Sequence, residues 1–251
     1  PSASTTITDH LNQCHTSPLI HLQSFKSEST SLSYQQSFQA VIGHQLWLRE
    51  RTAEYAGRAA SACDTGDVVV VAYLADNSPD LFLSLLACMS LTVSPNNDIG
   101  DTAKARALLP AMINTRWTPT EIEQAIGTTD GVHASWTLFV YGEGYEETAN
   151  EAAGLLRSKG GRCIALKLNE FSLDFASSRG SQEYLESEVE GKSQETALAD
   201  EDAVILFTSG TSSPRGAKGV RLSHRSLYVQ ALAKTQLPCQ YDTHTKVVAT
   251  T

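Results

Sequence analysis

Hydrophobic and polar positions follow two regular patterns along this chain, one typical of helices and one of buried strands. Residues 34–61 carry apolar side chains at near-helical spacing, which predicts one or two amphipathic helices. Residues 68–74 form a continuous apolar run, the pattern of a strand buried on both faces of a parallel sheet. Ser78 and Pro79 then supply a cap and a proline at the first helical position, so a helix should run to about Leu91.

The same alternation continues through the middle of the chain. Thr118-Pro119-Thr120-Glu121 is a capping box that predicts a helix to about Ile126. Residues 136–141 and 162–168 are expected to be strands, with a helix over 145–158 that ends at two glycines. Strands that alternate with helices predict an α/β fold of layered, mostly parallel sheets flanked by helices.

Polar stretches mark the parts outside this alternation. Residues 1–30 are expected to be an irregular N-terminal segment, 94–106 a surface loop and 170–200 a solvated linker. Residues 246–251 have the pattern of a strand that stops in mid-course, so we expect residues 31–251 to be the N-terminal portion of a larger domain.

Composition and charge narrow the class of protein. The chain has 251 residues, 41% of them hydrophobic, which is enough for a substantial core. A net charge of −9 disfavours a nucleic-acid or membrane-surface binder, because both need a cationic face. Five cysteines without a C-x-x-C pair are expected to be buried thiols in a reducing, intracellular compartment rather than zinc ligands. No apolar run reaches the roughly 18 residues needed to span a bilayer.

The candidate chemistry begins where a short apolar strand, Val204 to Phe207, runs into a segment rich in glycine and hydroxyl groups. A strand, such a loop and a following helix are the arrangement that binds phosphate at the carboxyl edge of an open sheet. Glycine lets successive N–H groups converge on one anion, hydroxyls add donors, and a lysine adds full charge. The candidate ligand-binding residues are Thr208, Ser209, Gly210, Thr211, Ser212, Ser213, Lys218 and Gly219.

Charge along the chain supports the same segment. Between Ala203 and Tyr241 there is no Asp or Glu and there are five Lys or Arg, so the rest of the chain carries −14. A polyanionic ligand would be drawn to this positive segment. The alternative is a surface loop whose few basic residues are merely solvated.

The segment does not match the Walker A pattern. Five residues separate Gly210 from Gly216, Ala217 precedes the lysine, and Gly219 stands where that pattern needs Ser or Thr. A nucleotide hydrolase of that class is therefore disfavoured.

The segment does resemble another family. Residues 206–220, with the Ser223-His224 pair, are similar to the phosphate-loop signature T-S-G-[ST]-[ST]-G-x-P-K-G-V of the adenylate-forming, or AMP-binding, enzymes. Residues 66–87 and 113–118 also resemble segments of that family. Two departures stand out: six residues from Ser212 lie before Lys218 where the pattern has four, and residues 94–106 are an insertion.

The resemblance implies the N-terminal part of an AMP-binding domain, without the mobile C-terminal lid domain. It implies an acyl- or aryl-CoA ligase of the 2-succinylbenzoate or 4-coumarate type that uses ATP, Mg²⁺ and coenzyme A on a small carboxylic acid. The acid and ATP would give an acyl-adenylate and pyrophosphate, and a thiol would then displace AMP.

Within this family the catalytic lysine and the adenine and ribose sites follow the segment present here, so we expect no catalytic residue in this chain and no activity of this polypeptide alone. His224, at a helix start, is expected to be structural. A non-catalytic paralogue that acts as a binding or scaffold subunit stays open as the alternative, because the loop is two residues longer than the pattern.

Overall fold

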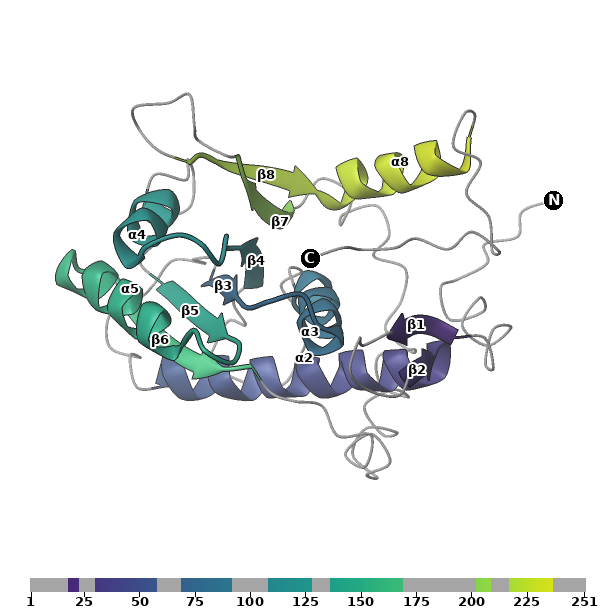
Figure 1. Cartoon of the computed structure of the whole chain (residues 1–251), viewed down its shortest axis with the longest axis horizontal. Coiled ribbons are helices and arrows are strands. Elements are labelled where there is room, and N and C mark those ends of the chain that lie inside the picture. Colours follow the sequence, from purple (N-terminus) through teal and green to yellow (C-terminus); the bar gives the residue numbers. More distant parts are fainter. Residues whose placement is uncertain are drawn as a thin grey trace.

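A six-stranded sheet forms the centre of the molecule (Figure 1). The computed structural model describes residues 18–22, 30–57, 69–91, 108–127, 136–168, 202–208 and 217–236. The strand order is β6-β5-β3-β4-β7-β8, and every neighbouring pair is parallel except the antiparallel pair β7–β8. The strands are β3 (Val69–Leu74), β4 (Leu108–Met112), β5 (Trp136–Tyr141), β6 (Arg162–Lys167), β7 (Asp202–Phe207) and β8 (Gly219–Ser223). The expected mostly parallel sheet is confirmed.

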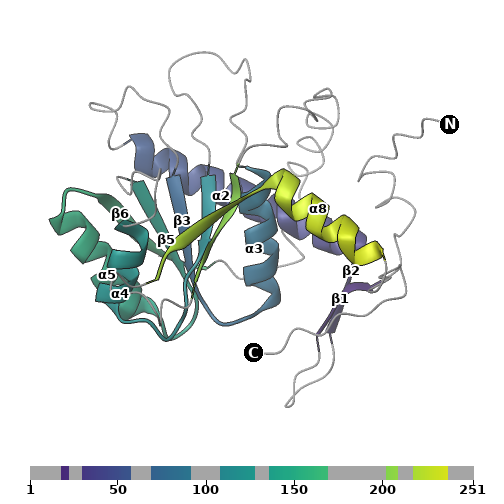
Figure 2. The same cartoon turned by 90° about the horizontal axis from the view of Figure 1, so that it is seen from above.

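Helices cover both faces of this sheet (Figures 1 and 2). The helices are α2 (Tyr34–Gly57), α3 (Pro79–Ser90), α4 (Pro119–Gly127), α5 (Glu146–Ser158) and α8 (His224–Thr235). Side chains of α2 and α3 pack with Val71 and Tyr73 of β3, whereas α4 and α5 pack with Ala72 and Leu74. Successive residues of a strand point to opposite faces, so the apolar run of β3 needs a helical layer on each side.

Hydrogen bonds of buried or half-buried polar groups tie α3 to β3 and to α2. The Tyr73 hydroxyl donates to the Ser84 carbonyl oxygen and lies 3.0 Å from the Ser84 hydroxyl. The Gln45 side chain donates to the hydroxyl of Ser90 at 2.5 Å, which joins α2 to α3. Cys88 is fully buried nearby, and burial raises the pKa of its thiol well above the ordinary range. These bonds fix how α3 lies on the sheet.

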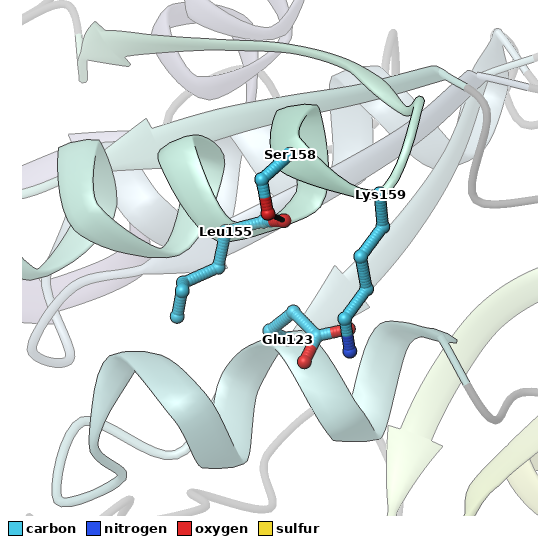
Figure 3. A network of polar contacts seen from close by, with 4 residues as sticks. All are labelled: Glu123, Leu155, Ser158 and Lys159. Atoms are coloured by element: carbon cyan, nitrogen blue, oxygen red, sulfur yellow. Dashed lines mark hydrogen bonds and ion pairs between the residues drawn. The ribbon is translucent and has the colours of Figure 1, made fainter.

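The opposite layer is locked by an ion pair between its two helices (Figure 3). Glu123 of α4 lies 2.7 Å from the Lys159 ammonium at the end of α5, and its side chain is only 8% exposed. In the same turn of α5, the Ser158 hydroxyl donates to the Leu155 carbonyl oxygen at 2.7 Å. A buried carboxylate needs such a partner, because unpaired burial of a charge is costly. The pair therefore holds α4 against α5.

Most predicted elements are confirmed. The helical pattern of residues 34–61 forms one helix as far as residue 57. Ser78 caps α3, because its hydroxyl accepts from the Leu81 N–H at 3.1 Å. The helix expected at 145–158 and the strand expected at 162–168 are both present. The expected loop at 94–106, the linker at 170–200 and the strand at 246–251 lie outside the described residues.

Two strands of the main sheet escaped prediction. β4 contains Pro110, which argues against a central strand because proline lacks the N–H of the ladder. The structure tolerates it because β7 pairs only with Ala111 and Met112, so β4 is flanked by a single strand at Pro110. β8 was expected to be part of the loop, but it pairs antiparallel with β7 before α8 begins.

The N-terminal region also holds a hairpin that sequence reasoning missed. β1 (Pro18–Leu22) pairs antiparallel with β2 (Thr30–Ser33), so part of the segment expected to be irregular is a strand. The remaining residues before Thr30 lie outside the described part of the chain. Among the helices that the structure describes, none combines the length and the apolar character of a bilayer span.

His44 lies in the middle of α2 with no exposed surface, and this burial lowers the pKa of its imidazole from 6.5 to about 4. The unfolded chain therefore binds a proton at this residue at higher pH than the folded chain does. Stability contributed by neutral His44 is fully present above pH 6.5 and is lost progressively as the pH falls toward 4.

We predict a loss of about 3 kcal/mol in the free energy of unfolding between pH 7 and pH 4 from this group. Urea unfolding at several pH values, compared with a His44→Gln variant, measures it. The variant should show a shallower pH dependence over this window. Parallel profiles for the two proteins would contradict the assignment.

Candidate functional site

The loops that follow β3, β4, β5 and β7 gather at one edge of the sheet, because these strands are parallel. Backbone bonds extend the ladder past the strand ends: the N–H of Ile113 donates to the Tyr73 oxygen at 2.9 Å, and that of Gly142 to the Leu74 oxygen at 3.0 Å. In open α/β sheets this carboxyl edge is where ligands bind, at points where the chain leaves neighbouring strands in opposite directions. The order of strands creates two such points here.

The first point, between β3 and β5, is filled by the chain itself. A Cβ atom placed on Gly142 would lie 2.8 Å from the Cβ of Ala75, so the two loops touch directly. The Tyr145 hydroxyl donates to the Asp76 carboxylate at 2.7 Å, and this bond raises the pKa of the phenol. Gly144, with φ of 84°, forms the turn that brings Tyr145 into position. These contacts join the loops after β3 and β5 directly.

The second point lies between β4 and β7. The chain leaves β4 toward α4 and β5, but leaves β7 toward the outer strand β8. The predicted phosphate-binding segment, residues 208–219, begins here. We call this segment the phosphate loop. Its first residue, Thr208, lies at the carboxyl end of β7.

The two ends of the phosphate loop are bonded to each other. The N–H of Thr208 donates to the Lys218 carbonyl oxygen at 3.0 Å, and the N–H of Lys218 donates to the Thr208 hydroxyl at 3.3 Å. Phe207 pairs with Gly219 immediately inside this closure. Both Thr208 and Lys218 are exposed to solvent.

The remaining candidate residues cannot be placed. Ser209, Gly210, Thr211, Ser212 and Ser213 lie outside the described residues, so their contribution stays a prediction. The structure therefore brings together three members of the candidate set: Thr208, Lys218 and Gly219.

Two details of the sequence interpretation need correction. The strand before the loop was expected to be buried, but only Ala203, Val204 and Ile205 of β7 are, and Leu206 is 42% exposed. The loop is followed by β8 rather than directly by a helix. Ser223 does cap α8, by accepting from the Ser226 N–H at 3.2 Å, as expected for the residue before His224.

The positive segment is also less positive than its sequence suggests. Arg221 of β8 forms an ion pair with Asp202 of β7, which lies one residue before the acid-free stretch. Its charge is thus compensated across the strand pair. Lys218, at the loop itself, keeps an exposed side chain.

The β4–α4 connection and the first residues of α4, residues 114–121, form a hydrogen-bonded turn beside Phe207, and we call it the bracket. The Asn114 side chain accepts from the Arg116 N–H at 2.9 Å. The predicted capping box is present: the N–H of Thr118 donates to the Glu121 carboxylate at 2.7 Å, and the N–H of Glu121 donates to the Thr118 hydroxyl at 3.3 Å. These bonds from Thr118 lower the pKa of Glu121.

An aromatic contact joins the bracket to Phe207, the last residue of β7 and the residue before the phosphate loop. The rings of Trp117 and Phe207 lie 5.5 Å apart between centroids at an interplanar angle of 74°, an edge-to-face arrangement. Sequence reasoning singled out the motif around Trp117 but not this contact, because the two residues are far apart in the chain. Within the described ranges, no three His, Cys, Asp or Glu side chains form a metal site.

Comparisons with known proteins bear on the fold. No protein-family model matches the sequence, and no curated protein matches it. Among solved structures, ATP-bound MatB from Rhodopseudomonas palustris is similar over 90% of this chain, with 19% identity and a TM-score of 0.50. The fold is that of the N-terminal domain of adenylate-forming ligases.

Two further solved structures are similar at lower scores. One is the fatty acyl-adenylate ligase from L. pneumophila in complex with acyl adenylate and pyrophosphate, with 16% identity over 86% of this chain and a TM-score of 0.48. The other is o-succinylbenzoate CoA synthetase (MenE) from Bacillus subtilis with its acyl-adenylate intermediate, with 14% identity over 82% and a TM-score of 0.44. This chain spans 36% of the MatB chain, 29% of the L. pneumophila chain and 31% of the MenE chain.

Gly142→Ala should destabilise the fold by about 1–3 kcal/mol, because the new methyl group must displace the Ala75 backbone. Gly154→Ala is the matched control: it lies in α5 with its nearest neighbour at 3.9 Å, so it should stabilise by about 0.5–1 kcal/mol. Urea unfolding of both variants measures the difference. Equal effects would show that the loops do not touch at the first point.

Thr118→Ala should cost about 1 kcal/mol of unfolding free energy, because it removes the hydroxyl that caps α4. Thr120→Ala, the same change at an exposed position two residues on, should stay within about 0.5 kcal/mol. Chemical denaturation separates the two. A loss of similar size in both variants would argue against the capping role.

Proposed function

We propose that this chain is the N-terminal part of an ATP-dependent carboxylate–CoA ligase and contributes its phosphate-binding loop. The observation that carries the proposal is the closure of that loop at the carboxyl end of β7, where Thr208 and Lys218 bond to each other just beyond the antiparallel pair β7–β8. The signature of adenylate-forming enzymes coincides with this position. The fold shared with MatB supports the same assignment.

The proposed reaction joins a carboxylate to the α-phosphate of ATP, which releases pyrophosphate and gives an acyl-adenylate. The thiol of coenzyme A then attacks the acyl carbon, and AMP leaves. Negative charge builds on the departing phosphates during the first step. Donors fixed in advance at the loop, with the Lys218 ammonium, would stabilise that charge without reorganising.

The residues at the loop fit a polyphosphate better than a free metal ion. The acid-free stretch from Ala203 to Tyr241 offers hydroxyls, backbone N–H groups and cations, but no carboxylate for Mg²⁺. We therefore propose that the ion enters as the complex with ATP and that this segment binds the phosphate oxygens.

Exposed apolar surface supports the proposal that the complete ligase includes further polypeptide. Five large apolar side chains on neighbouring elements are more than 40% exposed, and α8 buries none of its residues. They are Leu206 on β7, Val220 on β8, and Tyr228, Val229 and Leu232 on α8. Leu206 and Val220 are cross-strand partners, so these two side chains form one patch, and we propose that further chain would cover it.

Lys218→Ala should weaken pyrophosphate binding to this chain at least about tenfold, because the exposed ammonium beside Thr208 supplies the full charge at the loop. Lys234→Ala, the same charge change in the last turn of α8, should alter affinity less than about twofold. Calorimetric titration at low salt measures both. The full-length ligase should show a matching loss in the rate of adenylate formation.

An equal effect of the two lysine variants would leave only a non-specific attraction, and the loop assignment would be wrong. ATP–pyrophosphate exchange measured on the isolated chain tests the other half of the proposal. We expect no exchange, and measurable exchange would contradict the need for further polypeptide.

A further inference from the structure

We propose that Trp117 is a positioning residue for the two described ends of the phosphate loop: through Phe207, it keeps Thr208 and Lys218 hydrogen-bonded to each other. The ligand part of this inference rests on the proposed function, whereas the positioning part does not. Residue 117 lies outside the phosphate-loop signature, which covers residues 206–220.

Trp117 is held in place from its own side of the contact. Its backbone N–H donates to the Asn114 carbonyl oxygen at 3.1 Å. In the same turn, the Asn114 side-chain oxygen accepts from the backbone N–H of Arg116. The capping box of Thr118 and Glu121 fixes the next residues at the start of α4. The tryptophan thus extends from a bonded turn rather than from a free loop.

The base of the bracket is anchored in the core. Ile122 and Ile126 of α4 are fully buried against the sheet, and the pair of Glu123 with Lys159 joins α4 to α5 (Figure 3). Movement of the bracket would have to disturb this layer. The position of Trp117 is therefore set by the core and not by the phosphate loop.

Phe207 is the residue through which Trp117 would act on the loop. It is the last residue of β7, half-buried, and its cross-strand partner Gly219 has no side chain to pack beside it. Phe207 also packs against the buried clusters around Ala72 and Ile205, and Trp117 adds an edge-to-face contact at 5.5 Å. Because the next residue is Thr208, a fixed Phe207 fixes the start of the phosphate loop.

The bonds that close the loop are in contact with water. Thr208 and Lys218 are both exposed, so solvent competes for their two mutual hydrogen bonds. A strand end that is free to shift would lose them readily. The edge-to-face contact of Trp117 with Phe207 restricts that shift. Trp117 would therefore influence anion binding although it lies outside the loop.

Hydrogen exchange tests the positioning part without any ligand. In Trp117→Ala, the amides of Thr208 and Lys218 should exchange at least about tenfold faster than in the unchanged chain, while that of Val71 in β3 should be unaffected. Trp117→Phe should restore slow exchange, because it keeps a ring at the contact. Trp47→Ala is the control: that tryptophan packs on the opposite face, against the cluster of α2 and α3.

Pyrophosphate titration of the same variants tests the link to binding. Trp117→Ala should weaken affinity at least about fivefold, Trp117→Phe less than about twofold, and Trp47→Ala should leave affinity unchanged even where it lowers stability. Urea unfolding of each variant verifies that the protein is folded under the conditions of titration.

The outcomes separate the two proposals. If Trp117→Ala leaves the exchange of both loop-end amides unchanged, or if Trp47→Ala accelerates them equally, the positioning role is wrong. If exchange responds but Lys218→Ala does not weaken pyrophosphate binding, the proposed function is wrong and the positioning role stands. If Lys218→Ala weakens binding and Trp117→Ala does not, Trp117 has no part in ligand recognition.

Discussion

The complete burial of β3 is the constraint on which the rest of the structure depends. All six of its residues are buried, and it pairs on both sides with parallel strands. A strand without a solvent face must be covered by helices above and below, so α2 and α3 lie on one side and α4 and α5 on the other. Parallel pairing then brings the loops after the strands to one edge.

At that edge the chain leaves neighbouring strands in opposite directions at two points, between β3 and β5 and between β4 and β7. At the first point the loops contact each other directly. Gly142 contacts Ala75 and Tyr145 bonds to Asp76, so the loops after β3 and β5 are joined. The next strand along the chain lies on opposite sides for β4 and β7. Trp117 contacts Phe207 at this point, beside the hydrogen bonds between Thr208 and Lys218. The proposed site is therefore a consequence of strand order as much as of its own residues.

Local patterns predicted much of the fold because they act between residues close in sequence. The cap at Ser78, the capping box at Thr118 and the glycine at 160, with φ of 87°, each mark a helix end by bonds within a few residues. β4 was missed because Pro110 is locally unfavourable, and the structure accommodates it because β7 pairs only with Ala111 and Met112. β8 was missed because its pairing with β7 spans the phosphate loop.

The sequence by itself determined the fold class, the helix boundaries and the candidate loop, since these follow from apolar periodicity, caps and a contiguous motif. Only the tertiary structure decided the strand order, the exposure of Leu206 and the neutralisation of Arg221 by Asp202. It also decided the contact of Trp117 with Phe207. The physical reason is that these depend on which distant segments lie side by side, and register between strands is set by the packing of whole layers.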